Sequence, residues 1–264
     1  MWVASSKYWK WWAVGTLGVV LAAIVAAYVL FAVLFNDTST PIPVSDMING
    51  FRDDGADGPT QQGLPTAGVY VYTTQGGEEV DALGGTRHDY PPETTITVTR
   101  SDCGVNVRWD ALEERRESWQ LCSDSGALLL GGYVTFHQFF GQPDQQRFTC
   151  EAGSQFLPGQ LSEDDTWSID CAAGSLLETT TYEVLSIAAM DVNGESVDAV
   201  RLSVKVDVSG RSQGSSEGEL WLSRKSGLPL RWSETTETTS GSQIGPVHYS
   251  ESLTIELTSL TPHQ

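Results

Sequence analysis

From residue 66 onward, apolar and polar residues alternate with a period of two, and this alternation constrains the fold more than any other feature. It is clear in GVYVYTTQ, TTITVTR, GVNVRW, TTTYEVLSIAAM and SVDAVRLSVKVDVS, which are separated by Gly, Pro, Asn or Asp. Successive side chains of a strand point to opposite faces, so each segment predicts a strand with one buried face. The sequence therefore predicts an all-β, antiparallel domain of roughly ten to twelve strands.

The tryptophans of these strands are the candidate ligand-binding residues of the domain. They are Trp109, Trp119, Trp221 and Trp232. Trp109 shares a strand face with Val105 and Val107, and Trp232 shares one with Leu228 and Leu230. Such faces fill a core, or they line a groove if the sheet is curved and open. The sequence leaves both alternatives open.

An uncharged apolar run, AVGTLGVVLAAIVAAYVLFAVLF, occupies residues 13–35. A helix of this length spans a hydrocarbon core of about 30 Å, so we predict a transmembrane helix. Lys7 and Lys10 precede the run and no basic residue follows it until Arg52, which predicts a cytoplasmic N-terminus. The alternative is a cleaved signal peptide, whose apolar region is normally shorter and ends in a small-residue cleavage site.

This topology divides the chain into four parts. Residues 1–12 are a predicted cytoplasmic tail before the transmembrane helix. Residues 36–65 are rich in Pro, Gly, Asp and Thr and are predicted to be a flexible linker. Residues 66–264 are the predicted extracytoplasmic domain. We therefore expect a single-pass protein of the cell membrane.

The net charge of −19 restricts the partners of this domain, because every acidic residue lies at Asp37 or beyond. A surface of this charge repels nucleic acid, so we predict no nucleic-acid partner. No phosphate-binding loop occurs, and no cofactor is predicted.

Four cysteines are consistent with two disulfides in an oxidising compartment. Cys103 and Cys122 flank two strand candidates that can fold as a hairpin, and Cys150 and Cys171 each end another strand candidate. Cross-strand separations suit a disulfide, so we predict the pairs Cys103–Cys122 and Cys150–Cys171. A zinc or redox site is the alternative, but the chain has no CxxC motif.

A heptad repeats within the chain: GEEVDAL at residues 77–83 and GESVDAV at residues 194–200. Each copy is followed by two tryptophan-bearing strand candidates and a long aromatic strand. We therefore predict that the domain contains two diverged copies of one antiparallel unit, over residues 66–150 and 180–260.

Residues 194–237 resemble the LolA-type lipoprotein carriers, and the resemblance is carried by the segment SSEGELWLSRKSGLPLRWSETTE, residues 215–237. The matching residues are Trp221, Gly227, Leu228, Pro229, Leu230 and Arg231. The resemblance implies a curved antiparallel sheet or half-barrel whose concave face holds acyl chains or a protein partner. The helices that usually plug that half-barrel have no counterpart in this sequence. The whole chain also resembles membrane-anchored extracytoplasmic proteins of high-GC Gram-positive bacteria.

No catalytic constellation is evident among the titratable residues. His88 and Asp89 are neighbours in a predicted loop, His137 lies on an aromatic strand, and no GxSxG nucleophile motif occurs. The acidic pairs Glu78/Glu79, Glu113/Glu114 and Asp164/Asp165 fall in turn-like sequence, where we expect them to be solvated.

We therefore predict a non-catalytic binding or scaffolding module, with no catalytic residue and no metal site. Two alternatives remain open. One is a lipid or lipoprotein carrier with a hydrophobic concavity, and the other is an envelope enzyme with a site near His88 and Asp89. The membrane, a lipid or lipoprotein ligand and a protein partner are the partners these hypotheses imply.

Overall fold

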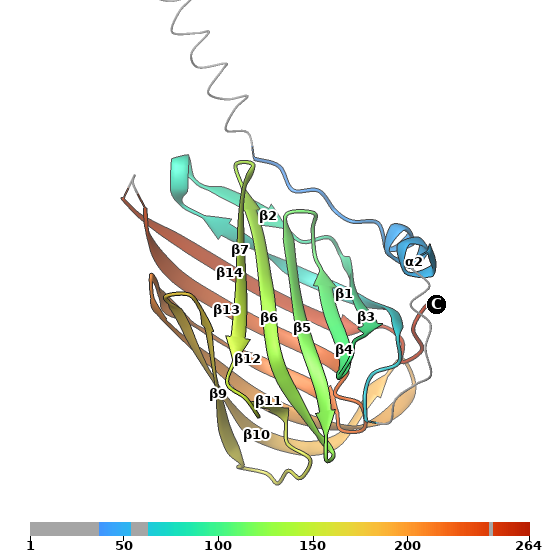
Figure 1. The fold of residues 1–264 in the computed structure, drawn as a ribbon. Coiled ribbons are helices and arrows are strands. Elements are labelled where there is room, and N and C mark those ends of the chain that lie inside the picture. Colours follow the sequence, from blue (N-terminus) through green and yellow to red (C-terminus); the bar gives the residue numbers. More distant parts are fainter. Residues whose placement is uncertain (1–36, 54–62, 243–244) are drawn as a thin grey trace, which may run out of the picture. The chain divides into compact units, whose positions relative to one another are not determined.

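The predicted strands form one antiparallel sheet that closes on itself (Figure 1). The closure is made by β1 (Gly68–Val80), which pairs with β3 (Glu93–Arg100) on one side and with β14 (Gly245–Leu257) on the other. Twelve strands form the ring. The prediction of an all-β antiparallel domain is confirmed. Because β1 and β14 pair from Tyr72↔Leu257 to Val80↔Tyr249, the sheet is a closed barrel and not the predicted half-barrel.

The remaining strands follow one another around the ring almost in chain order. From β3 to β14 they are β4 (Gly104–Asp110), β5 (Arg115–Asp124), β6 (Ala127–Phe139), β7 (Gln142–Cys150), β9 (Thr166–Ala173), β10 (Leu176–Val192), β11 (Glu195–Gly210), β12 (Ser212–Ser223) and β13 (Pro229–Ser242). Two short strands are not counted among the twelve: β2 (Thr86–Asp89) pairs with β1, and β8 (Gln155–Leu157) pairs with β6. A 3₁₀ turn, η1 (Ala82–Gly84), joins β1 to β2.

The structure is a computed structural model that describes residues 37–53, 63–242 and 245–264. The predicted cytoplasmic tail and the predicted transmembrane helix over residues 13–35 lie outside the described residues. Within the described part of the chain, no helix has the length and apolar character needed to cross a membrane.

Helix α2 (Val44–Asp53) lies in the segment that was predicted to be a linker. Its apolar side chains Met47, Ile48 and Phe51 pack against Ala67 and Val69 at the start of β1. Since Phe51 is buried in this contact, residues 44–53 are an ordered part of the domain rather than a free tether. The composition of residues 36–65 did not indicate this helix, because few of the helix residues are apolar.

The period-two alternation of the sequence places alternate side chains of the strands inside the ring. Val105, Val107 and Trp109 of β4 are all buried, as their shared face predicts. On β11 the half-buried Val204 and Val206 line the interior, whereas Lys205 between them is exposed. Each strand of the ring therefore contributes alternate side chains to the space that it encloses.

The segment that resembles the LolA-type carriers comprises most of β12, the connection over residues 224–228 and the first part of β13. Its Leu228 and Leu230 are buried in the main core. The Pro229 carbonyl accepts a hydrogen bond of 2.7 Å from the Tyr72 hydroxyl of β1. A Cβ atom on Gly227, whose φ is +67°, would lie 2.1 Å from Leu128 of β6. Because β1 and β6 are not neighbours of β12 or β13, the connection must cross the end of the ring.

The repeated heptads occupy different structural positions. The first ends β1 and enters η1, whereas the second runs from a turn at Gly194 into the start of β11. The proposed duplication over residues 66–150 and 180–260 gains no support from these placements and stays a prediction.

The two predicted disulfides are confirmed, and one of them lies at the weakest junction of the ring. Cys150 of β7 is paired directly with Cys171 of β9, and the only other pair between these strands is Thr149↔Ala172. Residues 142–148 therefore pair with β6 alone among the described strands. The Cys103–Cys122 bond instead reinforces the β4–β5 hairpin, which is paired along its whole length.

Because of this difference, removal of each disulfide should cost similar stability but should have different local effects. Their loops are similar, with sequence separations of 19 and 21, so each double Cys→Ser variant should lose a comparable 2–4 kcal/mol, as a rough estimate. Local effects should differ, because only the β7–β9 junction has so few other pairs. Hydrogen exchange should accelerate in β7 and β9 of C150S/C171S, while β4 and β5 stay protected in C103S/C122S. Equal loss of protection in both variants would contradict this view of the junction.

Candidate functional site

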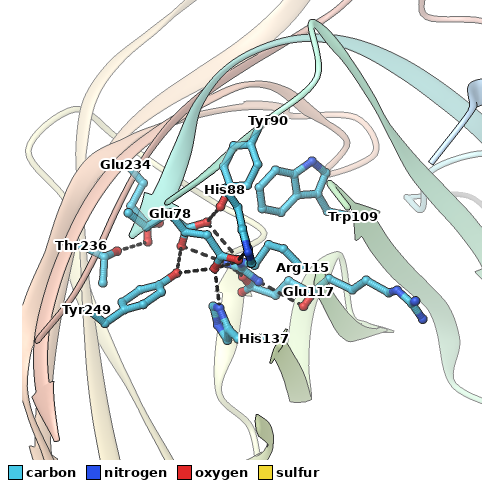
Figure 2. A network of polar contacts seen from close by, with 12 residues as sticks. Glu78, His88, Tyr90, Trp109, Arg115, Glu117, His137, Glu234, Thr236 and Tyr249 are labelled. Carbon is cyan, nitrogen blue, oxygen red and sulfur yellow. Dashed lines mark hydrogen bonds and ion pairs between the residues drawn. The ribbon is translucent and has the colours of Figure 1, made fainter. Parts of the chain in front are cut away.

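A network of buried polar side chains lies inside the ring (Figure 2). Strand pairing assembles it: Glu78 of β1 lies opposite His88 of β2 and opposite Glu251 of β14, and Arg115 of β5 lies opposite His137 of β6. All five side chains are at least four-fifths buried. The network therefore links β1, β2 and β14, where the ring closes, to β5 and β6.

Glu78 is the acceptor at the centre of this network. Its Oε1 accepts a hydrogen bond of 3.1 Å from His88 Nδ1, and its Oε2 accepts one of 2.8 Å from His137 Nδ1. Burial by itself raises the pKa of this carboxyl, but the hydrogen bonds from His137 and His88 outweigh burial and lower its pKa to about 2. Glu78 is consequently ionised throughout the physiological pH range.

Two neighbouring glycines allow β2 to come close enough for this contact. A Cβ atom on Gly77 would lie 2.4 Å from the carbonyl oxygen of His88. Gly76 has a φ of +125°, and a Cβ there would lie 1.9 Å from the Ser252 carbonyl oxygen of β14. Without side chains at these positions, β1 can pair with β14 and β2 at once.

Arg115 supplies the positive charge of the network. It holds Glu251 in two contacts, with Nε 3.0 Å from Oε1 and Nη2 3.1 Å from Oε2, and its Nη2 also donates to Glu117 at 3.0 Å. The guanidinium carbon lies 5.2 Å from the centre of the Trp109 ring, within reach of a cation–π contact. Burial opposes the charge of Arg115, but Glu251 and the neighbouring acidic groups together outweigh burial and raise the arginine pKa above its ordinary value.

Tyrosine hydroxyls complete the coordination of Glu251. The Tyr249 hydroxyl lies 3.0 Å from Glu251 Oε2 and 3.1 Å from Glu78 Oε2, so it links the two carboxylates that strand pairing places opposite each other. The Tyr90 hydroxyl donates to Glu251 Oε1. With Arg115 between them, these donors offset the repulsion that two facing carboxylates would otherwise create.

A second group of acids lies next to the tryptophans. Along β5, Glu117 is one inward position before Trp119, and along β13, Glu234 is one inward position after Trp232. Burial raises the pKa of Glu117 to about 8, although Arg115 works against this shift. Burial likewise raises the pKa of Glu234, despite hydrogen bonds from Ser216, Thr236 and Trp232.

Glu178 of β10 belongs to the same group. Its Oε2 accepts a hydrogen bond from the Tyr133 hydroxyl of β6. Burial raises its pKa to about 7, the Tyr133 hydrogen bond lowers it, and the nearby Glu234 raises it further. Glu178 and Glu234 differ from Glu78 because their hydrogen-bond donors are neutral, so burial dominates their pKa values.

Both groups of acids border a cavity of about 450 Å³ inside the ring. Its wall is apolar where Trp119, Leu121, Phe148 and Trp232 lie and polar where the carboxyl groups lie. This volume falls in the range of about 300–1,000 Å³ that is usual for small-molecule sites. The inward faces are therefore partly core and partly the lining of a cavity.

The structure brings three of the four predicted tryptophans together. Trp109, Trp119 and Trp232 form a cluster in which Trp232 contacts Trp109 at 5.4 Å and Trp119 at 5.7 Å between ring centres. Trp119 and Trp232 line the cavity, whereas Trp109 is fully buried behind Arg115. Trp221 lies on the opposite strand face from the cavity-lining Leu220, with its ring against Arg201.

The suggested His88/Asp89 site is not assembled in the structure. Strand alternation sends His88 into the interior, stacked on Phe139, whereas 76% of the Asp89 side chain is exposed and its carboxylate pairs with Arg87. The carboxylate beside His88 is Glu78, which was expected to be solvated in a turn. That expectation was wrong because residues 77–80 continue strand β1.

The remaining expectations have mixed outcomes. His137 lies on strand β6, as predicted, where it is mostly buried and hydrogen-bonded to Glu78. Glu114 is buried and accepts a hydrogen bond from the Thr40 amide, contrary to prediction, while Asp164 and Asp165 lie in a turn. Within residues 37–53, 63–242 and 245–264, no cluster of His, Cys, Asp or Glu is arranged to hold a metal ion.

The inward acids Glu117, Glu178 and Glu234 were missed by sequence reasoning. A usable signal existed, because each carries a charge at a position that shares its strand face with apolar or aromatic residues. In ESWQLC, for example, Glu117 shares a face with Trp119 and Leu121. An acid on the buried face of a strand indicates a polar interior site.

Comparisons with known proteins add little to this geometry. No protein-family model matches the chain, and no curated protein matches it. The crystal structure of "a putative lipoprotein" from Parabacteroides distasonis aligns with 74% of this chain and 98% of that chain, at 11% identity and a TM-score of 0.28. A score this low supports no argument about this chain. The resemblances to LolA-type carriers and to proteins of high-GC Gram-positive bacteria stay predictions.

Replacement of Arg115 tests whether the network depends on its charge. Arg115→Met keeps much of the side-chain length but leaves Glu251 and Glu117 buried without a cation, which should cost about 3–5 kcal/mol of unfolding free energy. The exposed Arg87→Met variant, which breaks the pair with Asp89, should cost less than about 1 kcal/mol. Urea unfolding of both variants measures the difference, and similar losses would contradict the central role of Arg115.

Glu178 should destabilise the protein at alkaline pH. Its folded-state pKa of about 7 lies above the ordinary 4.5, so its contribution to stability falls as pH rises through this interval. Glu178→Gln should therefore raise the melting temperature at pH 8 by about 2–4 °C, the shift that about 1 kcal/mol gives in a domain of this size. At pH 4.5 the variant and wild type should melt together. The exposed Glu183→Gln on the same strand is the control, and a pH-independent gain would refute this assignment.

Proposed function

We propose that this domain is an extracytoplasmic binding module that holds a small amphiphilic molecule in the cavity of its closed sheet. The observation that carries the proposal is the cavity itself, whose wall contains both apolar or aromatic side chains and carboxyl groups. A molecule with an apolar body and a polar group would match both parts of this wall.

The surroundings of His88 and Asp89 are poorly suited to general-base catalysis. A general base works best when its pKa lies near the operating pH, and the pKa of Glu78 is about 2. Both oxygens of Glu78 are engaged by histidines, and Asp89 points away from the interior. These observations support a non-catalytic role over the alternative of an enzyme near His88 and Asp89.

The expected location is consistent with this role. The two disulfides suit an oxidising compartment, and the predicted transmembrane helix over residues 13–35 would tether the domain to the cell membrane. A tethered domain with an internal cavity is suited to receiving a lipid or lipoprotein near the membrane surface. The carrier hypothesis is therefore the more specific form of our proposal.

A pair of tryptophan substitutions on β11 tests the proposal. Val206→Trp places a large ring inside the cavity, whereas Lys205→Trp places the same ring on the outer face one residue away. The full chain is purified and weighed by native mass spectrometry before and after organic extraction. Wild type and Lys205→Trp should carry an extractable mass that Val206→Trp lacks.

Two outcomes would count against the proposal. The same adduct on Val206→Trp would place the molecule outside the cavity, for example on the apolar N-terminal segment. A wild-type protein without any extractable mass would contradict a retained ligand. Circular dichroism of both variants checks that the sheet is intact.

A further inference from the structure

The cavity wall carries an excess of acidic groups. Its titratable residues include the carboxyl groups of Glu117, Asp144, Glu178, Glu234 and Glu251. Among the described lining residues, Arg115 is the only arginine or lysine, and it is already bonded to Glu251 and Glu117. His137, the other basic residue of the described lining, is hydrogen-bonded to Glu78, so the lining supplies no cation to Glu178 or Glu234.

Glu178 and Glu234 have only neutral hydrogen-bond donors among the described residues. Glu178 accepts from Tyr133, while Glu234 accepts from Trp232 Nε1 at 3.0 Å and from Thr236 Oγ1 at 2.9 Å. Glu234 disfavours the charge of Glu178. A cation placed near such carboxyl groups would favour their charged form.

Aromatic rings border the same acids. Tyr133, the partner of Glu178, stacks on Phe148 with ring centres 4.4 Å apart, and Trp232, the partner of Glu234, contacts Trp119. The charge of Glu234 also acts on the buried Tyr182. Aromatic faces attract cations, and a desolvated cation gains more from them than an exposed one.

We propose that the ligand of this cavity is a cationic amphiphile, whose ammonium group lies between Glu178 and Glu234 and whose apolar part lies against Trp119 and Trp232. This inference rests on the proposed binding function and specifies its ligand class. The ammonium group supplies the counter-charge that the wall lacks. An anionic amphiphile such as a free fatty acid is disfavoured, because its carboxylate would enter a space that already holds several acids.

Three probes with the same six-carbon tail separate the charge from the apolar contact. They are hexyltrimethylammonium, 1-hexanol and hexanoate, each titrated at pH 7.5 into the full chain held in lipid nanodiscs. Binding is followed through the fluorescence of the cavity tryptophans, and empty nanodiscs correct for partitioning. We expect hexyltrimethylammonium to bind at least about tenfold more tightly than 1-hexanol, and hexanoate to bind most weakly.

The outcomes distinguish this inference from the proposed function. Equal affinity for the ammonium and the alcohol, or a preference for hexanoate, would overturn the cationic ligand and leave a binding cavity. Failure of all three probes to bind would overturn the binding function, and the cationic ligand with it.

Isosteric substitutions locate the ammonium group. Glu178→Gln and Glu234→Gln should each weaken hexyltrimethylammonium binding by about tenfold and leave 1-hexanol binding unchanged, because only the charge is removed. Unchanged 1-hexanol binding also shows that each variant retains the folded cavity. Glu183→Gln, on the exposed face of β10, should alter neither affinity. Unchanged ammonium affinity in both cavity variants would overturn the placement between Glu178 and Glu234.

Discussion

The pairing of β1 with β14 is the contact on which the rest of the structure depends. It turns a curved sheet into a closed ring, and its register places Glu78 directly opposite Glu251. In an open sheet water would solvate both carboxylates, but closure buries them together. Arg115, reaching in from β5, and the hydroxyl of Tyr249 make this arrangement tolerable. The closure and the buried network therefore depend on each other.

The interior holds two kinds of buried acid, and the difference between them separates structure from function. Glu78 and Glu251 are engaged by histidine, arginine and tyrosine donors, so they support the closure. Glu178 and Glu234 have neutral donors, and burial raises the pKa of each. Acids that lower stability near neutral pH, and that border a cavity, are characteristic of functional sites. This contrast, more than the cavity volume, is the basis of the proposed cationic ligand.

Parts of the candidate site could be predicted from the sequence and parts could not. The inward faces containing Trp109 and Trp232 follow from strand alternation, and the structure places them inside. Glu78 was misplaced because its glycine-rich surroundings suggest a turn, although Gly76 and Gly77 instead allow three strands to approach closely. His88 and Asp89 are adjacent in sequence but point to opposite sides of β2. Neighbouring residues on a strand cannot converge on one site, whereas residues ten or more positions apart can.

The sequence by itself determined the strands, their inward faces and the disulfide pairs, because all of these depend on local alternation and on short hairpin-like connections. Only the tertiary structure decided that the ring closes, since Tyr72 and Leu257 are far apart in sequence and no periodicity signals their pairing. The cavity was likewise decided in three dimensions. Its volume depends on how many strands enclose the interior and on how far their side chains fill it, and neither quantity is a property of any one segment.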